Sequence, residues 1–275
     1  MAPRYTNPKL LEGINSGHEH PLLEVAKSSI IVFALIAVVI VGAYMAARFA
    51  APYLPFSWEI ALAEKMPRPD LGDDAAGSRT HRYITSLTAR VAAASDLPAD
   101  MAITVHYVEG DTVNAFATLG GHIVVFEGLW KLVDSENAAA MLIAHEIAHV
   151  KNRDPVRSAS GTLFASLAAG LMFGDIGVAN MGNDLTALQF SREQETQADS
   201  DAARAVFKLY GHLNGAADLF NRLRIVAKDA KQPPAFLASH PNLADRILGL
   251  RRLAGRNGWS FQGDKHKPKR NRRAK

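Results

Sequence analysis

Cysteine is absent from this 275-residue chain. A structural zinc site is closed by four ligands and usually includes Cys, so the absence counts against a module in which zinc only holds the fold together. It does not decide the compartment, because a chain without thiols suits oxidising and reducing surroundings alike. A metal site in this chain has to be built from His, Asp and Glu.

Acidic residues are missing from the last 11 positions, KHKPKRNRRAK, which hold seven Lys or Arg. Removing those seven from the 31 basic residues leaves 24 against 27 acidic ones, so the formal net charge changes from +4 to −3. The positive charge therefore belongs to a basic C-terminal tail. Such a tail is either a solubilising end or a contact for anionic lipid, and we predict no nucleic-acid partner from it.

Only one hydrophobic run is long enough to cross a bilayer. Residues 28–47 are uncharged and mostly apolar, and as a helix they would span about 30 Å, the thickness of the hydrocarbon core. The run lacks the regularly spaced polar residues of a buried core helix, and the 27 residues before it are too long and too acidic for a signal peptide. We predict one transmembrane helix over residues 28–49, with the aromatic residues after it at the headgroup level.

The orientation of this span follows from the basic residues beside it. Arg4, Lys9 and Lys27 precede the run, whereas Arg48 and Lys65 follow it. Because cytoplasmic flanks carry the excess of Lys and Arg, the count favours a cytoplasmic N-terminus. The rest of the chain would then lie in the periplasm or outside the cell.

The segment His145-Glu146-Ile147-Ala148-His149 matches the pattern HExxH. It lies in a stretch from 134 to 151 that opens with Asp-Ser-Glu, is rich in Ala, Leu and Met, and contains no Gly or Pro, which predicts one helix. On a helix, positions i and i+4 share a face, so both imidazoles can bind one metal ion. Glu146 is then placed to take a proton from water at that metal.

A catalytic zinc needs a third protein ligand. The pattern HExxHxxGxxH is excluded, because the chain has Asn152 and Pro155 where it requires Gly and His. A downstream helix offers Glu193 or Glu195 instead. Glu195 is favoured, because its ExxAD spacing places Asp199 on the same face, where Asp199 can accept the outer N–H of a ligand His.

Four segments, HEIAHVKNRD, SREQETQAD, NAFATLGGHIVVFEGLW and SHPNLADRI, together resemble peptidase family M48, the membrane-associated zinc endopeptidases that include the HtpX-type and CAAX prenyl-protein proteases. The resemblance covers roughly residues 80–255. It implies one Zn²⁺ per chain, bound by His145, His149 and Glu195, with Glu146 as the catalytic base. It also implies that His240 lies near the zinc, either stabilising the oxyanion or capping the metal in a resting state. Arg246 is expected to pair with acidic residues.

The remaining pattern predicts an α+β fold, a mostly helical zincin-type domain with a small antiparallel sheet. Apolar residues at helical spacing predict a helix over 78–95, and β-branched runs predict strands at 103–108 and 122–126. The expected parts are a polar N-terminal segment, the transmembrane helix, a linker, the metallopeptidase domain and the basic tail: 1–27, 28–49, 50–77, 78–258 and 259–275.

The resemblance further implies that a sheet edge binds substrate in extended form, where backbone hydrogen bonds hold a peptide whatever its sequence. The candidates for this edge are Asn114, Ala115, Phe116 and Ala117, and the alternative is an ordinary core hairpin. A second apolar region, residues 159–182, holds an apolar stretch too short to span a bilayer. We expect a lid or a membrane-contacting element there, with buried core as the alternative.

These features predict a membrane-anchored, zinc-dependent endopeptidase. Its expected partners are the lipid bilayer and protein or peptide substrates, such as misfolded membrane or envelope proteins. One alternative is a membrane-anchored binding or chaperone-like module with latent or no proteolysis. Another is a protease restricted to prenylated peptides, against which the single span argues.

Overall fold

The computed structural model describes residues 21–50, 53–65, 75–159 and 189–268. The greater part of the apolar region 159–182 and the end of the basic tail lie outside these residues, so the predicted lid stays a prediction. The chain divides into two compact units, residues 1–43 and 44–275.

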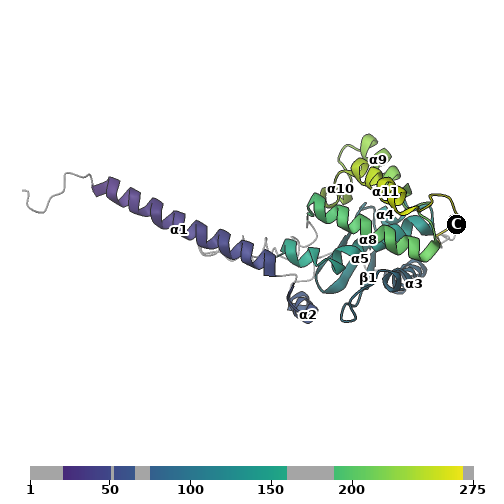
Figure 1. The fold of residues 1–275 in the computed structure, drawn as a ribbon, viewed down its shortest axis with the longest axis horizontal. Helices are drawn as coiled ribbons and strands as arrows, with labels where there is room; N and C mark the ends of the chain where they lie inside the picture. Colours follow the sequence, from purple (N-terminus) through teal and green to yellow (C-terminus); the bar gives the residue numbers. More distant parts are fainter. Residues whose placement is uncertain (1–20, 51–52, 66–74, 160–188, 269–275) are drawn as a thin grey trace, which may run out of the picture. The chain divides into compact units, whose positions relative to one another are not determined.

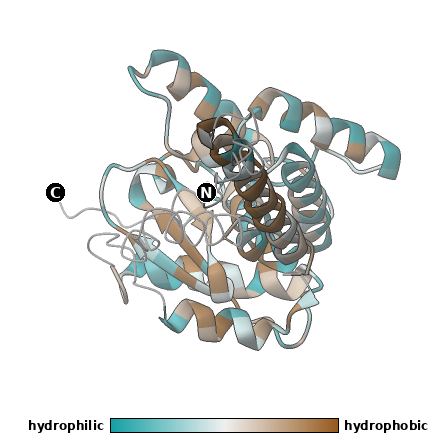
Figure 2. Ribbon diagram, turned by 90° about the vertical axis from the view of Figure 1, so that its left-hand side faces the viewer, coloured by the Kyte–Doolittle hydropathy of each residue, from teal (hydrophilic) through white to brown (hydrophobic). Residues whose placement is uncertain are grey.

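The N-terminal unit contains most of a long apolar helix, α1 (Pro21–Ala50), drawn at one end of the chain in Figure 1. Its stretch Leu22–Ala46 is 25 residues long, has a mean hydropathy of 2.7, and is the one helix in the described residues long and apolar enough to cross a membrane. Hydropathy colouring shows it as a continuous hydrophobic helix (Figure 2). The predicted transmembrane helix over 28–49 lies within α1.

A three-stranded sheet forms one layer of the second unit. Its strands are β1 (Thr104–Val108), β2 (Ala115–Ala117) and β3 (His122–Phe126), in the order β1-β3-β2. β2 pairs antiparallel with β3, as predicted, but β1 pairs parallel with β3 in the register Thr104↔His122. The sheet is therefore mixed rather than wholly antiparallel. Residues 109–121, which include β2, return the chain to the starting end of β1, as a parallel pair requires.

Helix α5 (Glu136–Lys151) is the centre of this unit. It begins after Ser135, whose hydroxyl accepts a hydrogen bond from the Ala138 amide, and it is buried on every side from Asn137 to Val150. One face packs on the sheet at β2, and others contact α3 (Arg79–Ala94) and α8 (Arg192–Tyr210). Alanines on α5 and α8 allow the two helix backbones to approach closely, which fixes the first turn of α8 beside the HExxH turn.

The remaining helices are the long helices α9 (Asp218–Asp229) and α11 (Leu243–Asn257) and the short helices α4 (Glu127–Trp130) and α10 (Phe236–Ser239). Helix α11 packs on α8 and α9 (Figure 1), whereas α4 contacts β3 and α10 contacts β2. Residues 119–121 form the short helix η2 (Leu119–Gly121) after β2. The helices predicted over 78–95 and 134–151 correspond to α3 and α5.

Contacts with the core extend past both predicted ends of the metallopeptidase domain. Helix α2 (Phe56–Lys65) falls within the expected linker, yet it packs on η2 and buries the Phe56 ring. At the other end, the Ser260 carbonyl accepts from the Leu213 amide and the His266 carbonyl from the Glu136 amide. The boundaries at residues 77 and 258 stay predictions.

Candidate metal centre

Two imidazoles on one face of α5 form the base of the site. His145 and His149 are one helical turn apart, and their Nε2 atoms lie 3.0 Å from each other. Neither side chain has accessible surface. The helical spacing read from HExxH therefore brings the two rings to one point.

The first turn of α8 contributes a carboxylate. A capping box fixes the start of this helix, with the Ser191 hydroxyl accepting from the Gln194 amide and the Gln194 side chain accepting from the Ser191 amide. Glu195 then points inward, with Oε2 3.5 Å from His145 Nε2 and Oε1 3.4 Å from His149 Nε2. Glu193, the alternative candidate ligand on this helix, is exposed to solvent.

The outer nitrogens of both rings meet carboxylates. His145 Nδ1 is 3.0 Å from Asp199 Oδ1, and His149 Nδ1 is 2.9 Å from Asp154 Oδ2. A carboxylate accepts only, so each Nδ1 carries the proton and each Nε2 presents its lone pair to the centre. Two lone pairs and the Glu195 carboxylate thus converge, an arrangement that a cation satisfies. The Arg246 guanidinium lies beside them, 3.1 Å from His145 Nε2 and 2.9 Å from Glu195 Oε2.

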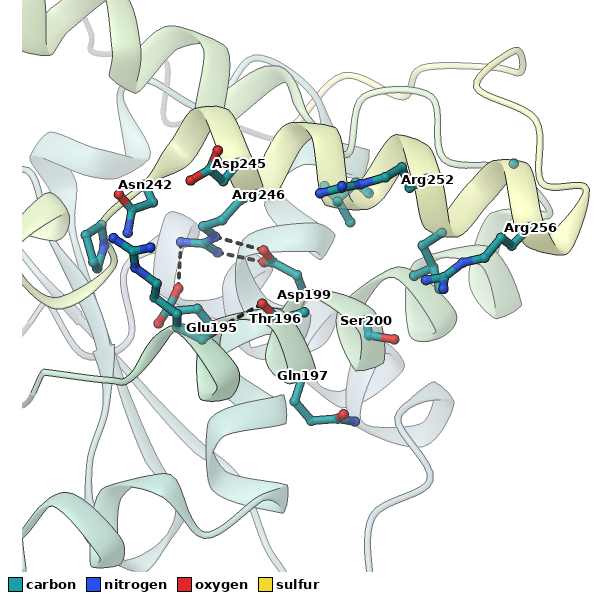
Figure 3. A pocket seen from close by; sticks show the side chains of 16 residues that line it. Glu195, Thr196, Gln197, Asp199, Ser200, Asn242, Asp245, Arg246, Arg252 and Arg256 are labelled. Carbon is teal, nitrogen blue, oxygen red and sulfur yellow. Dashed lines mark hydrogen bonds and ion pairs between the residues drawn. The ribbon is translucent and has the colours of Figure 1, made fainter.

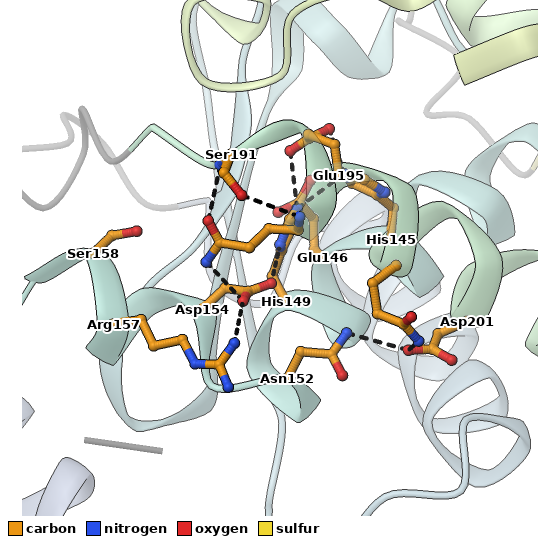
Figure 4. A network of polar contacts seen from close by, with 12 residues as sticks. His145, Glu146, His149, Asn152, Asp154, Arg157, Ser158, Ser191, Glu195 and Asp201 are labelled. Atoms are coloured by element: carbon orange, nitrogen blue, oxygen red, sulfur yellow. Dashed lines mark hydrogen bonds and ion pairs between the residues drawn. The ribbon is translucent and has the colours of Figure 1, made fainter. Parts of the chain in front are cut away.

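Asp154 was missed by sequence reasoning. It lies in a turn of helix over residues 154–159, and its second oxygen accepts a 2.8 Å hydrogen bond from the Gln194 amide group (Figure 4). The same Gln194 caps α8, so one hydrogen-bonded chain joins His149 to the start of the helix that carries Glu195. The signal was available in the sequence, since this Asp follows His149 by five residues within HEIAHVKNRD.

His240 follows α10 and enters the same centre. Its Nδ1 lies 2.9 Å from Glu195 Oε1 and 3.2 Å from His145 Nε2, while its ring stacks on Phe236 at 4.5 Å between centroids. Its Nε2 faces Glu146 Oε1 at 3.6 Å. The structure thus brings His240 to the ligand side of the site.

The distances among these atoms fit a tetrahedral zinc ion. One ligand atom from each of His145, His149, Glu195 and His240 lies within 4.8 Å of every other, and all four residues are buried. Zinc bonds to N and O of about 2.0–2.1 Å give a tetrahedron with edges of about 3.3 Å. The two Nε2 atoms are 3.0 Å apart, and each lies 3.4 to 3.5 Å from one of the two Glu195 oxygens, so these separations are close to that edge.

Glu146 is buried against this centre. Both of its oxygens are inaccessible, and within the described part of the chain neither finds a hydrogen-bond partner. Burial of an unpaired carboxylate is costly unless it holds a proton or faces a cation. A metal ion and a metal-associated water beside Glu146 would remove that cost, which is the arrangement that the HExxH motif predicts.

Arg246 on α11 binds the carboxylates of Asp199 and Glu195. Its Nε and one terminal nitrogen bond the two oxygens of Asp199 at 2.9 and 2.7 Å, and the other terminal nitrogen lies 2.9 Å from Glu195 Oε2 (Figure 3). Burial raises the pKa of Asp199, but the adjacent guanidinium outweighs it and brings that pKa down to about 2. Asp199 therefore remains a carboxylate that can orient His145. The predicted pairing of Arg246 with acidic residues is present.

A family model described as "Peptidase family M48" matches residues 78–254, which is more than half of the chain. The chain belongs to peptidase family M48.

Several relatives of this chain are named as proteases. The chain is 28% identical over 176 residues to the mitochondrial metalloendopeptidase OMA1 of Schizosaccharomyces pombe, covering 61% of this chain and 51% of that protein. It is 26% identical over 162 residues to the beta-barrel assembly-enhancing protease of Escherichia coli, covering 54% of this chain and 33% of that protein. A protease HtpX homolog of Desulfatibacillum aliphaticivorans is 28% identical over 207 residues, covering 58% and 66%. The match spans about half or less of the first two relatives.

In this M48 chain the predicted substrate edge is strand β2. β2 lies at the end of the strand order, and its register with β3 pairs Phe116 with Val124. The Thr118 amide donates to His122 and the Asn114 carbonyl accepts from Phe126, so the backbone groups of residues 114, 116 and 118 face β3. Because strand groups alternate, those of Ala115 and Ala117 point away from β3. Ala115 and Ala117 have 0% of their surface exposed, so these outward backbone groups are covered in the described state and can pair with a peptide only after the covering segments move.

A cavity of about 740 Å³ lies between α8 and α11, on the far side of Arg246 (Figure 3). Glu195, Asp199 and Arg246 contribute to its wall, together with Arg252 and Arg256 farther along α11. His145, Glu146 and His149 do not line it. This cavity therefore contacts the groups that support the centre rather than the reacting face beside Glu146.

Proposed function

We propose that this chain is a membrane-anchored, zinc-dependent endopeptidase with one Zn²⁺ per chain. The observation that carries the proposal is the convergence of the His145, His149 and Glu195 candidate ligand atoms beside the buried Glu146 carboxylate, which has no hydrogen-bond partner among the described residues. Membership of family M48 and the apolar helix α1 support a membrane-associated metallopeptidase.

The roles of the residues follow from their positions. When bound, zinc supplies a Lewis acid that activates water and polarises the scissile carbonyl. Glu146 takes the proton from the attacking water and later delivers it to the leaving amine. Asp199 and Asp154 hold the two ligand imidazoles in the tautomer that leaves Nε2 free. The backbone groups of β2 align an extended peptide beside α5.

His240 is proposed as a capping ligand of the resting site rather than an oxyanion donor. Its Nδ1 lies among the candidate ligand atoms, where it would compete with the water that hydrolysis needs. Burial lowers the pKa of its imidazole despite the nearby carboxylates, which favours the neutral, ligating form. Turnover then requires the His240 ring to move away from the other candidate ligands, so the described arrangement corresponds to a latent enzyme.

The substrates are proposed to be unfolded or misfolded membrane and envelope proteins, with the catalytic unit in the periplasm or outside the cell. A relative named as a beta-barrel assembly-enhancing protease and the basic residues before α1 support this assignment. A binding module without proteolysis is the second candidate, favoured by the complete burial of Glu146 and the ligands.

The test uses the full chain in detergent, with zinc content and cleavage of denatured casein measured together. Wild type is expected to bind one zinc and cleave casein. Glu146→Gln is expected to retain zinc and lose cleavage, because the amide cannot take the proton. Cleavage by Glu146→Gln at the wild-type rate would overturn the mechanism. Bound zinc with no cleavage by wild type, also in lipid vesicles, would favour the binding module.

A further inference from the structure

Helix α2 has two faces of opposite character. Phe56 and Glu59 are buried, with 1% and 3% of their surface exposed. On the other side, Trp58 is 65% exposed, and Tyr53 and Leu54 just before the helix are 77% and 41% exposed. Large exposed aromatic and aliphatic side chains gathered on one short segment need an apolar or interfacial partner.

The buried face fixes α2 to the metallopeptidase unit. Glu59 accepts a hydrogen bond from the Gly120 amide at 3.0 Å and forms an ion pair with Arg153 at 3.0 Å. The Arg153 guanidinium also lies over the Phe56 ring, 5.3 Å from its centroid. Gly120 is in the turn between β2 and β3, and Arg153 directly precedes Asp154. α2 is thus attached to the two segments that flank the site.

The exposed face forms one side of a shallow groove of about 420 Å³. Apolar residues of α2, namely Trp58, Ala61 and Leu62, line it together with Val156 from the turn of helix after Asp154. The ion-paired Glu59 and Arg153 and the ammonium group of Lys65, the last residue of α2, line the groove as well. A groove with apolar walls and basic groups beside them suits an acyl chain or glycerol backbone with an anionic headgroup above it.

The chain itself limits how far α2 can be from a bilayer. α1 ends at Ala50 and α2 begins at Phe56. Six residue steps, fully extended, reach at most about 20 Å. Trp and Tyr concentrate at the membrane–water interface, where a ring contacts apolar matter and its polar edge contacts water. A helix tied this closely to a membrane span, with Tyr53 and Trp58 exposed, has the lipid surface as its nearest partner.

We propose that the exposed face of α2, with Tyr53 and Leu54, docks on the lipid headgroup layer, and that its groove accepts lipid. The helix is then a second membrane contact besides α1. Because α2 also holds the turn after β2, this contact keeps the substrate edge beside the membrane surface. Unfolded segments emerging from the bilayer would reach β2 before soluble chains do.

The absence of native Cys makes a direct test possible in the full chain reconstituted in vesicles of phosphatidylethanolamine and phosphatidylglycerol. Single-Cys variants Trp58→Cys and Ala61→Cys are labelled with an environment-sensitive fluorophore. Ile225→Cys on α9 is the matched control, because Ile225 is 62% exposed on a helix with no such tether. Phospholipids with a spin label near the headgroup serve as quenchers.

Labels at 58 and 61 are expected to emit at shorter wavelength than the label at 225 and to be quenched by the spin-labelled lipid, whereas 225 is not. Using two groove positions guards against a local defect at either one. Labels at 58 and 61 as water-exposed as 225 would overturn the proposal, and so would equal quenching at all three positions. The readout needs no catalysis, so it stands or falls separately from the peptidase activity.

Discussion

At the scale of single residues, the candidate centre is a cluster of side chains that could bind one cation. His145, His149 and Glu195 each direct a lone pair inward, and Asp199, Asp154 and Arg246 fix the direction from outside. Burial lowers the pKa of His149, but hydrogen bonds from its ring to Asp154 and Glu195 outweigh it and raise that pKa to about 9 without metal. The site therefore attracts positive charge, as a proton or as a metal ion.

The choice between two carboxylates of α8 gives the first prediction. Glu195→Gln removes a proposed ligand and should lower zinc affinity by at least the 10- to 100-fold typical of lost support around a metal. Glu193→Gln is the matched control, because Glu193 is two residues away on the same helix but exposed. Zinc content by mass spectrometry after dialysis separates the two. Equal retention in both variants would remove Glu195 from the ligand set.

The second prediction concerns His240. If its imidazole caps the resting metal, His240→Ala opens the fourth position and should increase the rate of cleavage of a short peptide several-fold, since the competent state no longer has to be reached by displacing the ring. Zinc content is measured alongside. A decrease in kcat with zinc retained would instead identify His240 as the group that stabilises the oxyanion.

At the scale of elements, the sequence predicts best where local pattern and burial agree. The helices at α3 and α5 and the strand at β3 follow from capping residues, Ala and Leu content and β-branched runs. The parallel pairing of β1 with β3 could not be predicted, because alternation within a strand carries no information on its partner's direction. α2 was also missed, since its packing depends on Arg153, a residue far away in sequence.

The candidate site shows the same contrast between features that sequence spacing predicts and features that depend on tertiary packing. HExxH and ExxAD predicted that His145 and His149 share one helix face and that Glu195 and Asp199 share another, because fixed helical spacing converts directly into a shared face. Asp154 and the double pairing of Arg246 depend on how α5, α8 and α11 cross. No spacing rule within one helix specifies such a crossing.

Glu136, at the start of α5, joins three helices and gives a prediction on stability. Its carboxylate accepts hydrogen bonds from Tyr83 and Arg90 on α3 and from Tyr210 on α8. Burial raises the pKa of Glu136, but these three donors outweigh it and hold the pKa below the ordinary value of 4.5. Glu136→Gln should therefore lower the free energy of unfolding by about 1–3 kcal/mol at pH 7.

The pH dependence of that loss is set by the same shift. Because the folded-state pKa is lowered, the contribution of the carboxylate is fully present above pH 4.5 and disappears as pH falls through the folded-state value. Urea denaturation at pH 7 and below pH 4 should show the difference from wild type shrinking. Glu109→Gln, an exposed change after β1, is the control. A difference that stays constant across this range would contradict the carboxylate network.

At the scale of the whole molecule, the metal centre connects segments far apart in the chain. The candidate ligand atoms come from α5, α8 and the end of α10, so an ion bound there would crosslink three parts of the fold. Binding to the folded state alone stabilises it by mass action, by about 4 kcal/mol when free metal exceeds the dissociation constant 1,000-fold.

Removal of zinc should therefore lower Tm. With about 2–4 °C of Tm per kcal/mol for a domain of this size, the decrease is expected to be about 8–16 °C. Scanning fluorimetry with and without a strong chelator measures it. His149→Ala, which removes a ligand, should start from the lower Tm and show little further change with chelator. A wild-type Tm that is unchanged by the chelator would contradict the presence of a bound ion that links these helices.

The burial of the centre also affects how fast a bound ion would exchange with solution. None of His145, Glu146, His149 and His240 has accessible surface, and α5 is packed on every side. Among the described segments beside the centre, α10, with its single turn, and the first turn of α8 are the ones whose opening we expect to release a bound ion. The rate at which isotopically labelled zinc exchanges should then equal the rate of that opening. Amide hydrogen exchange in those two turns should report the same opening rate.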